Sequence, residues 1–182
     1  MTRAAFEDAQ KLFRSLYAAN CFRQCAAACK HITDTGMETT HPIYYTLMTG
    51  AFALYARPFE HSSYVGGFDA GIVPTEELQL HERLINVRDK ILVHNDPAGF
   101  PIGTSGEANQ VVFISNPDIQ TGSRWFYPRP PELRELMRLA ERMVAIVESL
   151  ANEVIERRRN LIPQGRSVLN VTEQNKPFTK RP

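Results

Sequence analysis

Hydrophobic residues recur at helical spacing in four stretches of the chain. The first runs from about Phe6 to Lys30, where apolar side chains return every three or four residues with charges between them. This pattern predicts a long amphipathic helix. The second runs from about Pro42 to Ala56 and is apolar on nearly every face. A helix of that kind is typically central and buried, and Arg57 and Pro58 are expected to end it.

Two later stretches are also predicted to be helices. The stretch from Pro74 to about His94 begins with a proline, a threonine and two acids, which is the composition of a helix N-terminus. The stretch from about Pro130 to Arg157 carries a heptad-like apolar stripe beneath a charged surface. The sequence therefore predicts an all-α fold, an up-and-down bundle of four or five helices that occupies residues 1–157.

The segments that follow the third and fourth helices do not have helical patterns. Two runs rich in β-branched and aromatic residues, 110–115 and 123–127, are separated by turn-forming residues, which predicts a small β-hairpin insertion at about 108–128. An irregular loop is the alternative. Residues 158–182 are polar, basic and aperiodic, so we expect an extended or disordered tail.

Length and charge set limits on what the protein is. A chain of 182 residues is long enough for one domain with its own core. The 21 basic and 20 acidic residues nearly cancel, so net charge does not point to a nucleic-acid partner. The N-terminus lacks the features of a secretory signal, and the longest apolar run, 43–56, is shorter than the roughly 20 residues that span a bilayer. We therefore expect a cytoplasmic protein without a membrane partner.

Three cysteines recur at every fourth position. On a helix, Cys21, Cys25 and Cys29 form a stripe of small, oily side chains, and His31 lies nearby. One helix presents them along a line, unlike the turn-borne pairs of zinc sites. Packing in the core is the favoured interpretation over a metal site, and we expect no metal and no organic cofactor.

One cation lies on the wrong face of the third predicted helix. A helical wheel places Arg88 near the centre of an apolar arc that includes Leu84 and Ile91. A guanidinium there needs a carboxylate, a set of carbonyls or a ligand. A structural ion pair is the simplest outcome. His94 follows at the predicted end of the same helix, which suggests instead that the two residues serve one substrate.

The segment RDKILVHND, residues 88–96, resembles the R-x4-6-H signature of HEPN domains. Its flanking Asp-Lys and its final Asp are most similar to the AbiU2-like branch. The resemblance implies a helical bundle that forms a homodimer, with two motifs facing one cleft. Many members are metal-independent ribonucleases of toxin–antitoxin or phage-defence systems, so RNA and an antitoxin or other protein become possible partners.

The resemblance also implies roles for individual residues. His94 would act as general acid or base, and Arg88 would bind phosphate and stabilise its developing charge. Asp89 would orient either group, and Lys90 or Asn95 would contact the RNA backbone. Members silenced by nucleotide addition carry a tyrosine where this chain has Asp96, which puts that form of regulation in doubt. The alternative functions are a non-catalytic HEPN module that binds RNA, a nucleotide or a protein, and a helical domain with a structural Arg88.

Overall fold

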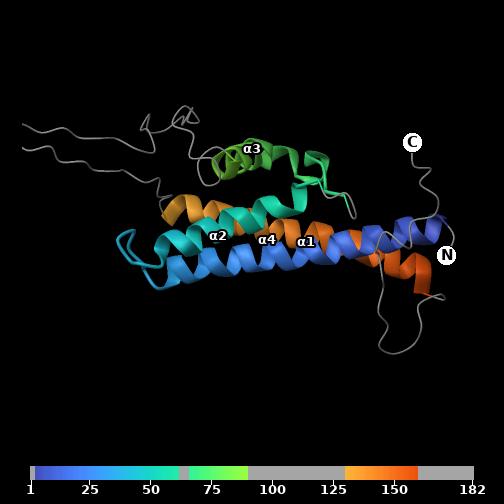
Figure 1. Cartoon of the computed structure of the whole chain (residues 1–182), viewed down its shortest axis with the longest axis horizontal. Helices are drawn as coiled ribbons and strands as arrows, with labels where there is room; N and C mark the ends of the chain where they lie inside the picture. The colour runs from blue at the N-terminus through green and yellow to red at the C-terminus, as the bar shows by residue number, and fades with distance from the viewer. Residues whose placement is uncertain (1–2, 62–65, 90–129, 160–182) are drawn as a thin grey trace, which may run out of the picture.

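The computed structural model describes residues 3–61, 66–89 and 130–159, which form four α-helices and three short 3-10 turns (Figure 1). The helices are α1 (Arg3–Asp34), α2 (Tyr44–Ala56), α3 (Leu78–Val87) and α4 (Pro130–Arg158). The turns are η1 (Arg57–Phe59), η2 (Ala70–Ile72) and η3 (Thr75–Glu77). This part of the chain contains no β-strand, which confirms the all-α class for it. None of its helices has an apolar segment long enough to cross a membrane.

The two long helices, α1 and α4, lie side by side and form the centre of the molecule (Figure 1). They run in opposite directions, because Asp8 near the start of α1 pairs with Arg157 and Arg158 at the end of α4. The core contains mostly small side chains from α1 and larger ones from α4. This difference in size suits close packing of the two helices. The small buried residues of α1 in this core are Ala18, Ala19, Cys25, Ala26 and Cys29, beside the larger Phe22 and Ile32, and the large ones of α4 are Leu133, Leu136, Leu139, Met143 and Val147.

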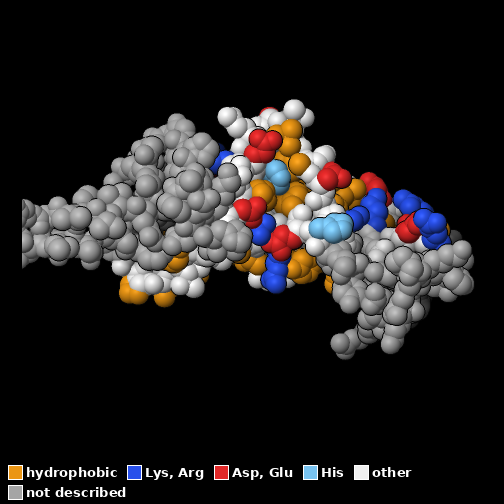
Figure 2. Space-filling model, turned by 45° about the horizontal axis from the view of Figure 1, so that its top comes forward, with side chains coloured by type: hydrophobic (Ala, Val, Ile, Leu, Met, Phe, Trp, Pro, Cys, Tyr) orange, Lys and Arg blue, Asp and Glu red, His pale blue; other side chains and the backbone are white. Residues whose placement is uncertain are grey.

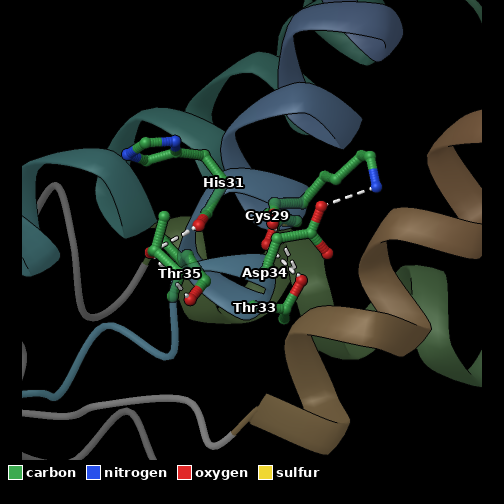
Figure 3. Close-up of polar contacts among 7 residues, drawn as sticks. Cys29, His31, Thr33, Asp34 and Thr35 are labelled. Carbon is green, nitrogen blue, oxygen red and sulfur yellow. Dashed lines mark hydrogen bonds and ion pairs between the residues drawn. The ribbon is translucent and has the colours of Figure 1, made fainter.

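Side chains and one glycine end α1 (Figure 3). The Thr33 hydroxyl donates to the carbonyl of Cys29 at 3.0 Å, and the Thr35 hydroxyl donates to the carbonyl of His31 at 2.7 Å. Gly36 then takes the left-handed conformation with φ of 60°, which glycine adopts without steric cost. The Met37 N–H reaches back to the carbonyl of Ile32, so the chain leaves the helix in the manner of a Schellman cap.

The second helix, α2, packs against α1 on one side and α3 on another. Its Tyr44, Met48 and Tyr55 are fully buried. The helix begins two residues later than the proline pattern predicts, and Ile43 precedes it with 48% of its surface exposed. The prediction that this helix is buried is confirmed. The most extensive packing among the described elements is nevertheless that of α1 with α4.

The four predicted helices are all present, with some shifts at their ends. The first extends a few residues beyond both predicted ends, and the fourth matches its predicted bounds to within one residue. The third begins as the 3-10 turn η3, and its α-helical part starts only at Leu78. The predicted end of that helix near His94, the hairpin at 108–128 and residues 160–182 of the tail lie outside the described residues.

Candidate functional site

The candidate site is built around the end of α3. His81, Leu84 and Val87 are the buried residues of this helix and attach it to the core. Arg88 continues the same helix in a wider, π-type turn, and its backbone N–H contacts the carbonyls of Leu84 and Ile85. The side chain of Arg88 is only 18% exposed. The prediction that Arg88 faces inward is therefore confirmed, and its guanidinium needs partners.

Two carboxylates surround the Arg88 guanidinium. Its terminal nitrogen Nη1 donates to Glu60 Oε1 at 2.5 Å. Its Nε lies 2.8 Å from Asp89 Oδ1. Nε is buried and has no hydrogen bond within the described part of the chain, so this contact is an ion pair without an aligned hydrogen bond. Arg88 thus combines a well-aligned ion pair with Glu60 and a second carboxylate that balances its charge without satisfying its donor.

The position of Glu60 depends on the tight packing of the segment that follows η1. Phe68 N–H donates to the carbonyl of Pro58 at 2.9 Å, which holds residues 66–68 against η1. Gly67 lies so close to Glu60 that a Cβ there would come within 2.5 Å of the Glu60 carbonyl oxygen. Only glycine permits this approach, so Gly67 fixes the backbone that presents Glu60 to Arg88.

Of the remaining predicted site residues, the structure describes only Asp89, which is half-buried beside Arg88. Lys90, His94, Asn95 and Asp96 belong to the segment 90–129, which the structure does not describe. The meeting of Arg88 and His94 at one site therefore stays a prediction.

A buried histidine that the sequence analysis missed lies on the same face as Arg88. His81 is 6% exposed, and its Nδ1 lies 2.9 Å from the hydroxyl of Tyr55. Phe59 packs on it with ring centroids 4.4 Å apart. His81 precedes Arg88 by seven residues, which is about two helical turns, so a helical wheel places both residues on the same face. The hydrogen bond between His81 and Tyr55 links α3 to α2 on the face that also carries Arg88.

Burial sets the protonation of this pair. Loss of solvent lowers the pKa of His81, although the nearby Glu82 charge acts in the opposite direction. Burial also raises the pKa of Tyr55 above its ordinary value, with help from Cys25 and Glu77. We therefore assign a neutral imidazole whose Nδ1 accepts the hydrogen bond from a protonated Tyr55.

A groove of about 220 Å³ opens beside Glu60, between α1 and η1. Its walls include Phe13, Arg14 and Tyr17 of α1, together with Arg57, Glu60 and His61. We refer to it as the α1–η1 groove. Glu60 contributes to this groove and also binds Arg88, so the two sites are neighbours. Figure 2 shows a face of the molecule on which basic and acidic side chains lie between areas of apolar surface.

The cysteine stripe is part of the core. Cys21, Cys25 and Cys29 are buried and free of disulfides, which confirms the packing interpretation. The hydrogen bond with Cys29, together with burial, raises the pKa of the Cys25 thiol well above its ordinary value. No group of three or more potential metal ligands converges among the residues that the structure describes.

Comparison with known protein families, with curated proteins and with solved structures finds no match to this chain. The resemblance to HEPN domains accordingly rests on residues 88–96 alone.

Proposed function

We propose that this chain is a HEPN-like, metal-independent endoribonuclease of the toxin–antitoxin or phage-defence type. In this proposal Arg88 and His94 of two copies share one cleft. The observation that supports it is the placement of Arg88 on the inward face of α3, with a side chain only 18% exposed. A guanidinium held in this way loses little rotational freedom when it binds a phosphate.

His94 and Arg88 have different roles in the proposed reaction. Imidazole titrates near neutral pH, so His94 is suited to move a proton to or from the ribose 2′-hydroxyl or the leaving oxygen. Arg88 binds the phosphate and stabilises the charge that develops on it. Asp89, 2.8 Å from Arg88 Nε, is suited to orient the guanidinium. Lys90, Asn95 and Asp96 are proposed as contacts to the RNA.

The second candidate function is a non-catalytic HEPN module that binds RNA, a nucleotide or a protein partner through the same cleft. Among these partners, one specific observation favours a protein without phosphate groups. Arg88 already has Glu60 at 2.5 Å and Asp89 at 2.8 Å, so two carboxylates compete with any phosphate. A structural role for the ion pair remains the simplest third possibility.

The deciding experiment is cleavage of total cellular RNA by the purified full-length chain in excess EDTA. The test variants are Arg88→Ala, Arg88→Lys and His94→Ala. Arg83→Ala is the matched control, because Arg83 lies on the same helix and pairs at the surface with Glu135. Circular dichroism and thermal denaturation establish that each variant is folded.

Each pattern of results has a defined meaning. Cleavage by the original chain and by Arg83→Ala, lost in both Arg88→Ala and His94→Ala, is the expected result. Arg88→Lys keeps the charge but loses the planar fork, so we expect much reduced cleavage in a folded protein. RNA binding without cleavage, weakened by Arg88→Ala, would establish the binding module. Unchanged cleavage in both alanine variants would refute the assigned site.

A further inference from the structure

The α1–η1 groove has features of a ligand site that the proposed cleavage reaction does not use. Phe13 and Tyr17 are 41% and 38% exposed. Their rings are parallel to within 6°, with centroids 6.3 Å apart. Two aromatic rings on successive helical turns therefore present apolar faces to solvent instead of packing in the core. Such an arrangement is suited to stacking with a flat, aromatic ligand.

Two arginines and a histidine line the groove together with these rings. Arg57 is exposed and has no ion-pair partner among the described residues, and His61 lies beside it. Arg14 is fixed by a hydrogen bond of 3.3 Å from Nη1 to the Gly67 carbonyl, and its guanidinium carbon lies 4.8 Å from the Phe68 ring centre.

The Nε of Arg14 is buried and has no hydrogen-bond partner among the described residues.

The negative charge in the groove is already neutralised. Glu60 is the acidic residue among the groove walls, and its carboxylate binds Arg88. Arg14 and Arg57 therefore leave the groove with a positive balance. The volume of about 220 Å³ is below the ~300–1,000 Å³ of typical small-molecule sites. This size suits one ring system with its charged group at the groove edge.

We propose that the α1–η1 groove binds one nucleotide unit. The base stacks on Tyr17 and Phe13, and the phosphate pairs with Arg57 and Arg14. The nucleotide is either free in solution or part of single-stranded RNA, and the chemistry is shared by both. This inference deepens the proposed function and rests on it only where RNA is the source. Glu60 lines the groove and also pairs with Arg88, so the groove adjoins the site proposed for cleavage.

The test measures binding to the full-length chain by fluorescence anisotropy. The probe is a labelled, 2′-O-methylated twelve-residue oligonucleotide, which lacks the free hydroxyl needed for cleavage and so separates binding from catalysis. AMP is titrated as a competitor. The variants are Tyr17→Ala and Arg57→Ala, both at exposed positions. The controls are Ile43→Ala, an apolar residue 48% exposed outside the groove, and Arg138→Ala, an exposed arginine of α4.

We expect Tyr17→Ala and Arg57→Ala each to weaken binding by roughly 10-fold, with a smaller salt dependence for Arg57→Ala. Both controls should stay within about two-fold. Competition by AMP would assign a free nucleotide, and its failure would assign RNA. No binding, or equal binding by all variants, overturns the proposal. It is likewise overturned if sedimentation shows that Tyr17→Ala only separates two copies of the chain. Cleavage through Arg88 and His94 can persist in each of these cases.

Discussion

Replacing Glu60 by glutamine is expected to destabilise the fold and at the same time strengthen phosphate binding. The variant keeps the size of the side chain but removes the charge 2.5 Å from Arg88 Nη1. A charge pair at about 4 Å gains ~1 kcal/mol in water and ~4 kcal/mol at the effective dielectric of a protein surface. Arg88 is 18% exposed and Glu60 49%, so solvent screens much of this gain. We expect the free energy of unfolding of Glu60→Gln to be lower by about 1–2 kcal/mol, which lies between the values for exposed and buried ion pairs.

A double-mutant cycle isolates this interaction. Urea denaturation of the original chain, Glu60→Gln, Arg88→Met and the double variant gives the coupling energy, and we expect about 1 kcal/mol. Filter binding with RNA gives the second readout. A phosphate must displace Glu60, so removing that carboxylate should raise affinity by roughly 5- to 30-fold. A coupling energy below about 0.3 kcal/mol would show that the pair does not form in solution. Lower RNA affinity in Glu60→Gln would refute competition between carboxylate and phosphate.

Four further predictions test the supporting structure. Gly67→Ala forces a Cβ within 2.5 Å of the Glu60 carbonyl oxygen, so we expect the free energy of unfolding to fall by about 1–3 kcal/mol. The NMR signal of the Arg88 side chain should shift in the same variant. Because burial lowers the pKa of His81, its unfolded form binds a proton more readily. The melting temperature should therefore fall as pH drops below about 6.5, less so in His81→Phe, and an equal fall in both would contradict this. Leu136→Ala, at a fully buried site, should cost about 2–5 kcal/mol in urea denaturation. Asp8→Asn should lower the free energy of unfolding by about 1–2 kcal/mol in urea denaturation, since the buried Asp8 carboxylate holds two arginines of α4; unchanged stability would contradict a role for this pair.

The helices of this fold are predictable from sequence because their signal is repeated along many residues. The apolar period of α4 extends over a helix of 29 residues, so a single exception does not obscure it. The wheel that identified α3 also identified Arg88 as a cation on its apolar face. The ends of the helices were less predictable. Residues Thr75–Glu77 form a 3-10 turn before α3 begins. The same composition is compatible with a 3-10 turn and with an α-helical turn, so the sequence does not show where α3 starts.

The partners of Arg88 were not predictable from sequence. Glu60 lies 28 residues earlier in an irregular segment, and no periodicity links the two positions. Their contact depends on the close approach of Gly67 to the Glu60 backbone, which is a property of tertiary packing. His81 was missed for a different reason. Its spacing from Arg88 was visible on the wheel, but its hydrogen bond to Tyr55 comes from a separate helix.

The pairing of the first helix with the last has a consequence for how the chain folds during synthesis. About 120 residues separate the end of α1 at Asp34 from the end of α4 at Arg158. At ribosomal rates of ~5–20 residues per second, α1 waits roughly 6–25 s for its main partner. Until then, among the described elements made before α4, mainly α2 and η1 cover the buried face of α1. The nascent chain therefore exposes apolar helical surface, and its core closes only after α4 has been synthesised.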